Sequence, residues 1–235
     1  MLLRTLFFHC CVYPWTILVI LCGVPLSFIS PDYLHNCARI WAKGCLFLAG
    51  TRVTVEGTEH IPTQTSAVYV ANHQSHFDIL AMYACLPIQF RWMAKQELFN
   101  IPLFGLTMRR SGYIPIDRSN SRKSLQSMIA AARRVNTGTS VVIFPEGTRS
   151  TDGRLLPFKQ GGFLIATKAK APLVPVVING SARILRRGSK RIYPGHIRIT
   201  VQPAIHTTES SSKDLDSLST QVKNAIATHL SEVAA

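Results

Sequence analysis

Apolar residues are densest at the start of the chain, where no Lys, Arg, Asp or Glu occurs between Thr5 and Ser30. A stretch of this length can cross a bilayer, for which about 20 apolar residues suffice. Pro14 and Pro25 lie inside it and are expected to bend or interrupt a helix, because proline lacks the N–H that helical hydrogen bonding requires. The pattern predicts a hydrophobic helical segment near the N-terminus.

The next apolar stretch, residues 34–49, carries Arg39 and Lys43 four positions apart. This spacing is typical of a helix that lies at the membrane interface with its basic groups among the headgroups. Residues 1–50 are therefore predicted to form a membrane anchor. Three arrangements stay open: one span followed by an interfacial helix, a two-helix anchor in one leaflet, or a hydrophobic hairpin that belongs to a soluble core.

From residue 51 onward, short apolar runs alternate with amphipathic stretches. The pattern predicts strands at 52–57, 67–71, 90–94, 113–116, 140–144, 173–178 and 197–201, and helices at 79–84, 102–112, 121–135, 162–170 and 214–232. In the helix at 121–135, core-facing positions are expected at Leu125, Met128, Ile129 and Ala132. Pro175 indicates that the strand at 173–178 is an edge strand or contains a bulge.

Strands that alternate with helices predict an α/β domain over residues 51–235, with a mixed, mainly parallel sheet flanked by helices. The strand at 197–201 is expected to add antiparallel pairing. The predicted fold is thus one α/β domain of ordinary size preceded by an N-terminal hydrophobic helical membrane anchor.

The formal net charge of +14 favours an anionic partner. Nucleic acid is disfavoured, because the chain lacks the interleaved aromatic and basic residues that stack bases and any nucleic-acid motif with the right spacing. Membrane phospholipids are the predicted partner. Nearly all Lys and Arg residues follow the N-terminal segment, so the α/β domain is expected to face the cytoplasm from the inner (cytoplasmic) membrane.

Five of the six cysteines lie within the first fifty residues, and none belongs to a Cys-x-x-Cys pair. A disulfide framework or a zinc site is therefore disfavoured. The cysteines are interpreted as small apolar residues in a reducing compartment.

The first stretch with chemical potential is Asn72-His-Gln-Ser-His-Phe-Asp78, between a predicted strand and a predicted helix that should begin near Ser75. Asp78 on the first helical turn can hold His73 by one ring N–H and leave the other ring nitrogen free to take a proton. The nucleophile would then be a hydroxyl group of the substrate. A metal site that includes His76 is the competing interpretation, but no further ligand lies nearby with suitable spacing.

The second stretch, Phe144-Pro-Glu-Gly-Thr-Arg-Ser150, also follows a predicted buried strand, so both turns can border one crevice. Glu146 can accept hydrogen bonds from a polyol, Gly147 lets the backbone approach a ligand, and Arg149 offers a planar fork for phosphate. The alternative is a surface turn in which Glu146 and Arg149 pair with each other. Arg118, at another strand end, either contacts a phosphate or is solvated or paired with Asp117.

These motifs together resemble the four ordered blocks of the glycerophospholipid acyltransferase family. The blocks are His73-x4-Asp78, Gly112-x4-Asp117-Arg118, Phe144-Pro-Glu-Gly-Thr-Arg-Ser150 and Val174-Pro-Val-Val-Ile178. The length, the apolar N-terminus and Lys95-x-Glu-Leu-Phe99 are similar to the bacterial 1-acyl-sn-glycerol-3-phosphate acyltransferases of that family. The resemblance covers roughly residues 50 to 205, and it departs at Pro115, where the family more often has Phe.

The resemblance implies transfer of an acyl chain from an acyl thioester to the sn-2 hydroxyl of lysophosphatidate, which gives phosphatidate for phospholipid biosynthesis. His73 would be the general base and Asp78 its partner. The implied substrate-binding residues are Glu146, Gly147, Thr148, Arg149, Arg118 and Lys95. No metal or bound cofactor is implied, and the co-substrate is an acyl-CoA or an acyl-carrier-protein thioester. The alternatives are another lyso-acceptor or glycerol 3-phosphate, or a non-catalytic basic membrane-binding protein.

A basic segment lies outside these blocks. No Asp or Glu occurs from Gly153 to Thr208, and the segment contains Arg183, Arg186, Arg187, Lys190 and Arg191. It is either a solvated loop or a surface that faces anionic lipid or an acidic acyl carrier protein.

Overall fold

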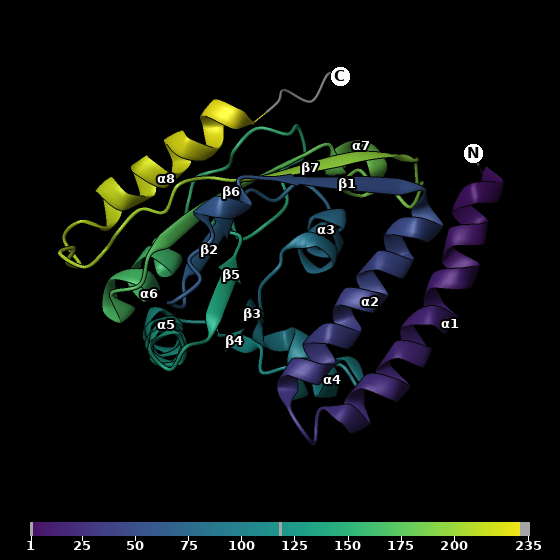
Figure 1. Cartoon of the computed structure of the whole chain (residues 1–235), viewed down its shortest axis with the longest axis horizontal. Helices are drawn as coiled ribbons and strands as arrows, with labels where there is room; N and C mark the ends of the chain where they lie inside the picture. The colour runs from purple at the N-terminus through teal and green to yellow at the C-terminus, as the bar shows by residue number, and fades with distance from the viewer. Residues whose placement is uncertain (1, 118, 231–235) are drawn as a thin grey trace.

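The computed structural model describes residues 2–117 and 119–230, and in it one seven-stranded sheet carries helices on both faces (Figure 1). The strands are β1 (Thr51–Glu56), β2 (Val68–Ala71), β3 (Phe90–Lys95), β4 (Ile114–Ile116), β5 (Ser140–Ile143), β6 (Leu173–Asn179) and β7 (Gly195–Val201). The helices are α1 (Leu2–Leu26), α2 (Pro31–Ala49), α3 (Phe77–Cys85), α4 (Phe104–Arg110), α5 (Ser121–Asn136), α6 (Gly161–Ala169), α7 (Ser181–Ile184) and α8 (Leu215–His229). Two short 3-10 helices are η1 (Thr58–His60) and η2 (Gln96–Asn100).

The strand order is β1-β7-β6-β2-β5-β3-β4. Among the described strands, β6 and β7 form the one antiparallel pair, and the other neighbours are parallel. The predicted mixed, mainly parallel sheet and the antiparallel pairing of its last strand are confirmed. In such a sheet the carboxyl ends of β2, β5, β3 and β4 meet at one edge, where ligands of open α/β sheets bind.

Alternate residues of the central strands point to opposite layers, because side chains alternate along a strand. Tyr69 and Ala71 of β2 pack with α2 and α3, whereas Val68 and Val70 pack with α5, α6 and α8. Figure 1 shows α1, α2 and α3 on one side of the sheet and α5, α6 and α8 on the other.

Pro175 lies inside the sheet, so the predicted edge strand is wrong: β6 has β7 on one side and β2 on the other. The carbonyl of Pro175 accepts a hydrogen bond from the N–H of Gln202, just past the end of β7 at Val201. The backbone N and C=O of one strand residue face the same neighbouring strand, so the nitrogen of Pro175 faces β7. The pairing of β6 with β7 ends at Val176 and Val201, at the residue next to Pro175. The missing N–H therefore costs the sheet no bond.

The core-facing stripe of α5 also differs from the prediction. Met128 and Ala132 are buried as expected, but Leu125 and Ile129 are 47% and 37% exposed. The buried stripe instead continues through Ala131 and Val135, rotated about the helix axis. Leu125 then borders an open cavity beside the sheet edge.

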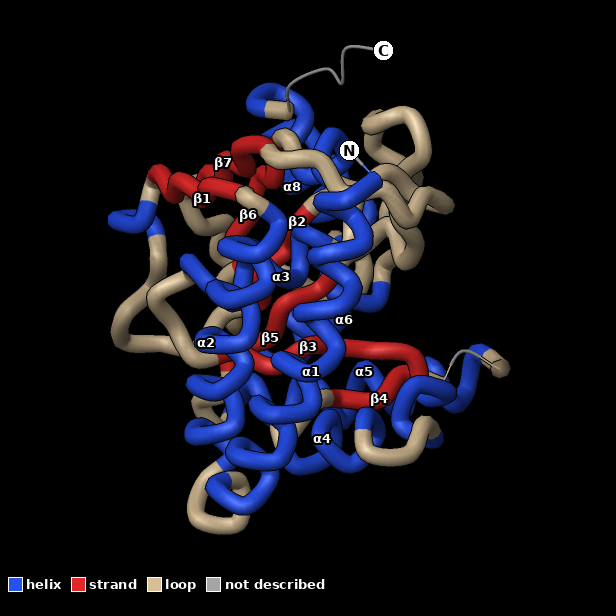
Figure 2. Tube along the Cα trace, turned by 90° about the vertical axis from the view of Figure 1, so that its right-hand side faces the viewer, coloured by secondary structure: helices blue, strands red, loops and turns tan. Residues whose placement is uncertain are grey.

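Helices α1 and α2 form a hairpin, side by side in both views (Figures 1 and 2). The indole N–H of Trp15 donates to the carbonyl of Trp41 at 3.0 Å, and the indole N–H of Trp41 donates to Oγ1 of Thr16 at 2.9 Å. Gly44 makes this approach possible, since an added Cβ would lie 2.4 Å from Nε1 of Trp15. These contacts flank Pro14, and α1 is one continuous helix through Pro14 and Pro25, so the expected interruption does not occur.

The hairpin contacts the α/β domain near both ends of α1 and along one face of α2. Near the start of α1, Oγ1 of Thr5 accepts from the N–H of Ile192 at 3.2 Å. Near its end, Ser27 accepts hydrogen bonds from Arg110 of α4. One face of α2 joins the core of the domain through Ala42, Cys45, Leu46 and Ala49. The outer face stays apolar and exposed, with Leu3 at 82% and Phe47 at 83%.

Candidate active site

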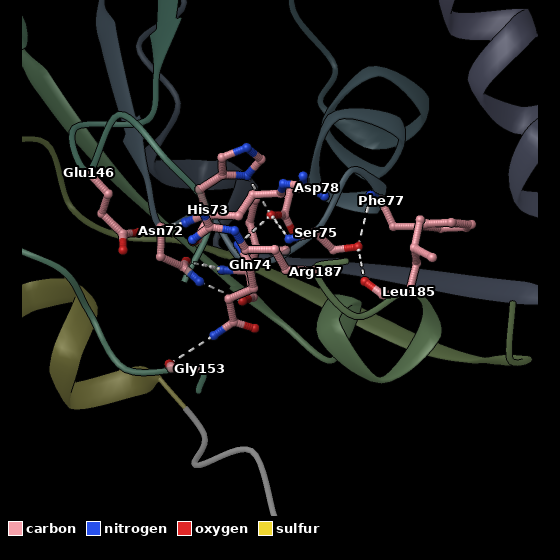
Figure 3. Close-up of polar contacts among 12 residues, drawn as sticks. Asn72, His73, Gln74, Ser75, Phe77, Asp78, Glu146, Gly153, Leu185 and Arg187 are labelled. Carbon is pink, nitrogen blue, oxygen red and sulfur yellow. Dashed lines mark hydrogen bonds and ion pairs between the residues drawn. The ribbon is translucent and has the colours of Figure 1, made fainter. Parts of the chain in front are cut away.

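His73 and Asp78 are joined at the carboxyl end of β2 (Figure 3). Oδ2 of Asp78 lies 2.8 Å from Nδ1 of His73 and also accepts from the N–H groups of Gln74 at 2.7 Å and Ser75 at 2.8 Å. The Asp78 side chain is completely buried and the His73 side chain is 13% exposed. An ionised carboxylate only accepts hydrogen bonds, so we assign the proton to Nδ1 and a free lone pair to Nε2.

The turn that carries this pair is fixed by its neighbours. Helix α3 begins at Phe77, two residues later than predicted, which leaves residues 72–76 as a loop. The Asn72 side chain bonds both backbone groups of Ile178 in β6, donating to its carbonyl at 2.9 Å and accepting from its N–H at 2.7 Å. Oγ of Ser75 donates to the carbonyl of Leu185 at 2.8 Å. Asn72 and Ser75 therefore hold the loop against two later segments.

Two aromatic rings support the imidazole. The rings of His73 and Phe144 are stacked with centroids 3.9 Å apart and 9° between their planes. Phe144 in turn stacks on Trp92, with centroids 5.2 Å apart. Sequence reasoning missed both roles. Phe144 is the first residue of the Phe-Pro-Glu-Gly-Thr-Arg-Ser motif, but nothing in the sequence pattern indicates that its ring faces the histidine.

Glu146 is buried and braces two loops. Its Oε1 accepts from the N–H of His73 at 2.7 Å, and its Oε2 accepts from the N–H of Leu156 at 2.9 Å. Burial raises the pKa of Glu146 above its usual value, and these two hydrogen bonds oppose that shift. The described contacts include no ion pair between Glu146 and Arg149, which contradicts the self-paired surface turn. Glu146 thus joins the two motif loops directly.

The remaining residues of this turn lie around the histidine loop. Gly147 has φ of +70°, a conformation that glycine adopts without strain. Thr148 is exposed and Arg149 is partly buried. Partial burial and the nearby Arg187 lower the pKa of Arg149, and the Arg187 side chain donates to the Arg149 carbonyl at 2.6 Å.

Two other predicted binding residues are less closely connected. Lys95 is exposed at the end of β3, two strands from β2 on the same edge of the sheet. In the described part of the chain, no hydrogen bond or ion pair joins Lys95 to His73, Asp78 or Glu146. Arg118 lies outside the described residues.

His76 immediately precedes α3, and its side chain is exposed. Desolvation and the charge of Arg149 lower its pKa. Over residues 2–117 and 119–230, no group of three or more His, Cys, Asp and Glu residues is arranged to hold a metal ion.

One cavity borders this centre, and a second lies further away, beneath the helical hairpin. One, of about 630 Å³, lies at the ends of β3, β4 and β5 and is lined in part by Phe144, Gly147, Lys159 and the start of α5. The other, of about 100 Å³, is mostly apolar and lies between the hairpin and α4. Its lining includes Trp41, Tyr83, Met108 and Tyr113. The ring centroids of Tyr83 and Trp92 are 5.8 Å apart. Tyr83 therefore connects this cavity to Trp92, whose ring stacks on Phe144 beneath His73.

Comparison with known proteins gives consistent matches. The Acyltransferase family matches residues 52–179. The chain is 34% identical over 196 residues to the chloroplastic 1-acyl-sn-glycerol-3-phosphate acyltransferase LPAT1 of Arabidopsis thaliana, covering 81% of this chain and 54% of that protein. It is 30% identical over 222 residues to the human 1-acyl-sn-glycerol-3-phosphate acyltransferase alpha, covering 93% of this chain and 78% of that protein.

The fold also matches a solved structure. The crystal structure of the 1-acyl-sn-glycerophosphate (LPA) acyltransferase PlsC from Thermotoga maritima superposes with a TM-score of 0.80 at 26% identity, covering 97% of this chain and 95% of that chain. The plant relatives are longer: this chain spans 54% of the Arabidopsis protein and 61% of the chloroplastic 1-acyl-sn-glycerol-3-phosphate acyltransferase BAT2 of Brassica napus.

Proposed function

Because this chain belongs to the acyltransferase family, we propose that it transfers an acyl chain from a thioester donor to the sn-2 hydroxyl of 1-acyl-sn-glycerol 3-phosphate, giving phosphatidate. The names of its relatives support this acceptor and product. Within the chain, one observation carries the proposal: a histidine bonded through Nδ1 to a buried aspartate keeps Nε2 free at the ligand-binding edge of the sheet.

In the proposed reaction, Nε2 of His73 takes the proton of the acceptor hydroxyl as that oxygen attacks the thioester carbonyl. The new C–O bond forms, the C–S bond breaks, and the proton passes to the departing sulfur as the free thiol. Asp78 stabilises the charged imidazolium and holds its orientation. A general base of this kind contributes about 10²–10⁴-fold to the rate. The two substrates supply every atom that is transferred, so the reaction as written needs no metal or bound cofactor.

We assign the phosphate and glycerol of the acceptor to the region around Arg149 and the 630 Å³ cavity. Arg149 supplies a guanidinium fork, and Lys159 and the N-terminal end of α5 border the cavity with positive charge or free N–H groups. Gly147 lines the cavity, Thr148 follows it in the chain, and Lys95 adds positive charge at the same sheet edge. Glu146 acts by holding the His73 loop, because both of its oxygens already accept backbone N–H groups.

We assign the transferred acyl chain to the apolar cavity between the hairpin and α4. Trp41, Tyr83, Met108 and Tyr113 give it a hydrocarbon-like lining. A chain that enters beside Trp92 would leave its carbonyl near His73. The length of chain that fits there would then set the preference for the acyl donor.

The hairpin is proposed to anchor the protein in one leaflet of the membrane. Helix α1 is the helix of the described chain that is long and apolar enough to span a bilayer. However, its start bonds Ile192 and its end bonds Arg110, and both partners belong to the α/β domain. A transmembrane orientation would move one end about 30 Å across the hydrocarbon and break one of these contacts. The exposed apolar face of α1, with Leu3 and Phe7, is instead suited to lie within one leaflet.

The test is an assay of the purified full chain in detergent, with lysophosphatidate, other lysophospholipids and glycerol 3-phosphate as acceptors, each with acyl-CoA and with acyl carrier protein. We expect phosphatidate from lysophosphatidate as the fastest reaction. A higher kcat/KM for another acceptor would move the assignment to that acceptor. Absence of turnover with every pair, in protein that still binds vesicles, would support a non-catalytic membrane-binding role.

A further inference from the structure

A cluster of arginines lines a third cavity, which shares no lining residue with the acceptor cavity or the apolar cavity. Arg183, Arg186, Ser189, Arg191 and Tyr193 line this space of about 510 Å³, called here the arginine hollow. The three arginines are exposed, and Ser189 and Tyr193 are partly buried. The residues come from α7 and the loop that leads from it into β7. None of them is used in the proposed chemistry at His73.

These guanidinium groups have no acidic partner. The sequence has no Asp or Glu from Gly153 to Thr208, and the ion pairs found among the described residues involve other side chains. Like charges that converge on one cavity repel each other, so the arrangement favours an anion in the hollow. Several phosphate groups would match it best, because each guanidinium can bond a phosphate with two parallel N–H donors.

The arginine hollow is held at a fixed position relative to the catalytic loop. The carbonyl of Leu185 accepts from Oγ of Ser75 at 2.8 Å (Figure 3). The Arg187 side chain donates to the Arg149 carbonyl at 2.6 Å. On the other side, the N–H of Ile192 donates to Thr5 of α1. A ligand bound in this hollow would therefore keep a constant offset from His73, as required of a donor whose reactive carbonyl must reach the histidine.

We propose that the arginine hollow binds the phosphorylated nucleotide end of a coenzyme A thioester, and this inference rests on the proposed acyl transfer. Such a donor carries a pyrophosphate and a ribose phosphate, which suit the three arginines, and an adenine ring that can stack on Tyr193. The volume falls within the range of about 300–1,000 Å³ that is typical of small-molecule sites. An acyl carrier protein would need a broad surface. The headgroup of a membrane lipid that takes no part in the reaction would not need a fixed position relative to His73.

The first test compares two triple variants that remove the same charge. In Arg183→Gln/Arg186→Gln/Arg191→Gln, the KM for acyl-CoA is expected to rise at least about tenfold, since the variant loses the hydrogen bonds that three charged groups would donate to phosphate. The kcat at saturating donor and the KM for the acceptor should stay unchanged. The control, Arg133→Gln/Lys168→Gln/Lys223→Gln, changes three exposed basic residues elsewhere and should behave as wild type. For acyl donors that end at phosphopantetheine, without the nucleotide, the KM should be the same in both variants as in the wild type.

The second test measures binding of adenosine 3′,5′-bisphosphate to the full chain in detergent by calorimetry, so it does not depend on turnover. Wild type and the control should bind it, and the hollow variant should bind at least about tenfold more weakly. Equal binding by all three proteins, or an unchanged KM for acyl-CoA, overturns the proposal. So does a defect confined to the acyl-carrier-protein donor or to anionic vesicles, which would assign the surface to a protein or a lipid.

The two proposals can fail separately. If no acceptor is acylated, but wild type and control bind the bisphosphate and the arginine-hollow variant does not, the nucleotide site is supported and the acyl-transfer function is contradicted. If acylation proceeds while wild type does not bind the bisphosphate, the acyl-transfer function stands and the nucleotide site falls.

Discussion

The imidazole of His73 lies flat on the phenyl ring of Phe144, with centroids 3.9 Å apart and 9° between the planes. Asp78 fixes one edge of the imidazole and Phe144 fixes its face, so the direction of Nε2 is determined by two independent contacts. A general base needs this restriction, because rates fall steeply when the reacting atoms are misplaced.

Replacement of Phe144 by Leu should therefore slow catalysis without unfolding the protein. Leu keeps an apolar side chain but offers no flat surface to the imidazole. We expect kcat to fall about 10- to 100-fold, with little change in the KM for either substrate. Steady-state kinetics with thermal unfolding as a control would measure this. An unchanged kcat would mean that Asp78 alone orients the ring.

His73→Ala should lower kcat by about 10²–10⁴-fold and leave binding to anionic vesicles intact. Asp78→Asn should also lower kcat, because an amide can present N–H rather than oxygen to His73 and reverse the tautomer. Phosphatidate formation and vesicle co-sedimentation would be measured on the same preparations. Wild-type turnover in His73→Ala would remove this residue from the mechanism.

Glu146→Gln should destabilise the site although it preserves the shape of the side chain. The amide keeps one acceptor oxygen, so its NH₂ group must face the N–H of His73 or of Leu156. An unsatisfied pair of this kind costs about 1–3 kcal/mol. We expect a lower Tm and a lower kcat, measured in detergent. A large rise in the acceptor KM at unchanged Tm and kcat would instead favour direct contact between Glu146 and the substrate.

His76→Gln should keep most of the activity, and metal chelators should not inhibit the wild type. Desolvation lowers the pKa of His76 below 6.5, so between that lowered pKa and 6.5 its ring stays neutral in the folded protein. The pH dependence of activity at acid pH should therefore be the same in the variant as in the wild type. Activity lost to a chelator and restored by a divalent metal would revive the metal-site interpretation.

Gly44→Ala tests the packing of the helical hairpin. The new methyl group would lie 2.4 Å from the indole nitrogen of Trp15, whose N–H is held by the carbonyl of Trp41. Overpacking of this kind costs about 1–3 kcal/mol, so the Tm should fall. Phe47→Ala on the exposed face of the same helix is the matched control, and it should weaken vesicle binding while leaving the Tm in detergent unchanged.

The one-leaflet arrangement predicts that positions 9 and 190 are neighbours in the membrane, because Nε2 of His9 lies 3.1 Å from the carbonyl oxygen of Lys190. In a background with Cys10 and Cys11 replaced by Ala, His9→Cys/Lys190→Cys should be joined by a short thiol cross-linker in intact vesicles. A transmembrane α1 would separate the two positions and prevent this product.

The sequence was sufficient for the main architecture and for the location of the chemistry. The alternation of strands and helices predicted the sheet and its parallel character, and His73 and Asp78 were identified by spacing. Their contact is local, so five positions of separation and a helix start were enough to infer it. In the structure, Nδ1 of His73 lies 2.8 Å from Oδ2 of Asp78.

Features that depend on tertiary contacts were not predictable in this way. Periodicity predicts that Leu125 and Ile129 face the core, but both are exposed, because the covered face of a helix depends on which elements pack against it. The expectation that Pro175 marks an edge strand is wrong, because it depends on where the adjacent strand β7 ends, and the sequence does not show this. The partners of Glu146 are backbone N–H groups, which leave no trace in residue identity.

The attachment of α1 to the rest of the fold has a consequence for biosynthesis. The Thr5–Ile192 hydrogen bond joins positions 187 residues apart, and β1, which follows the hairpin, pairs with β7 near the end of the chain. Helix α1 thus has to wait until residue 192 has been synthesised before this hydrogen bond can form. Exposed apolar helices are prone to aggregation during such an interval. Early insertion of the hairpin into a bilayer would protect it, so we expect soluble yield to depend on the presence of membrane during translation.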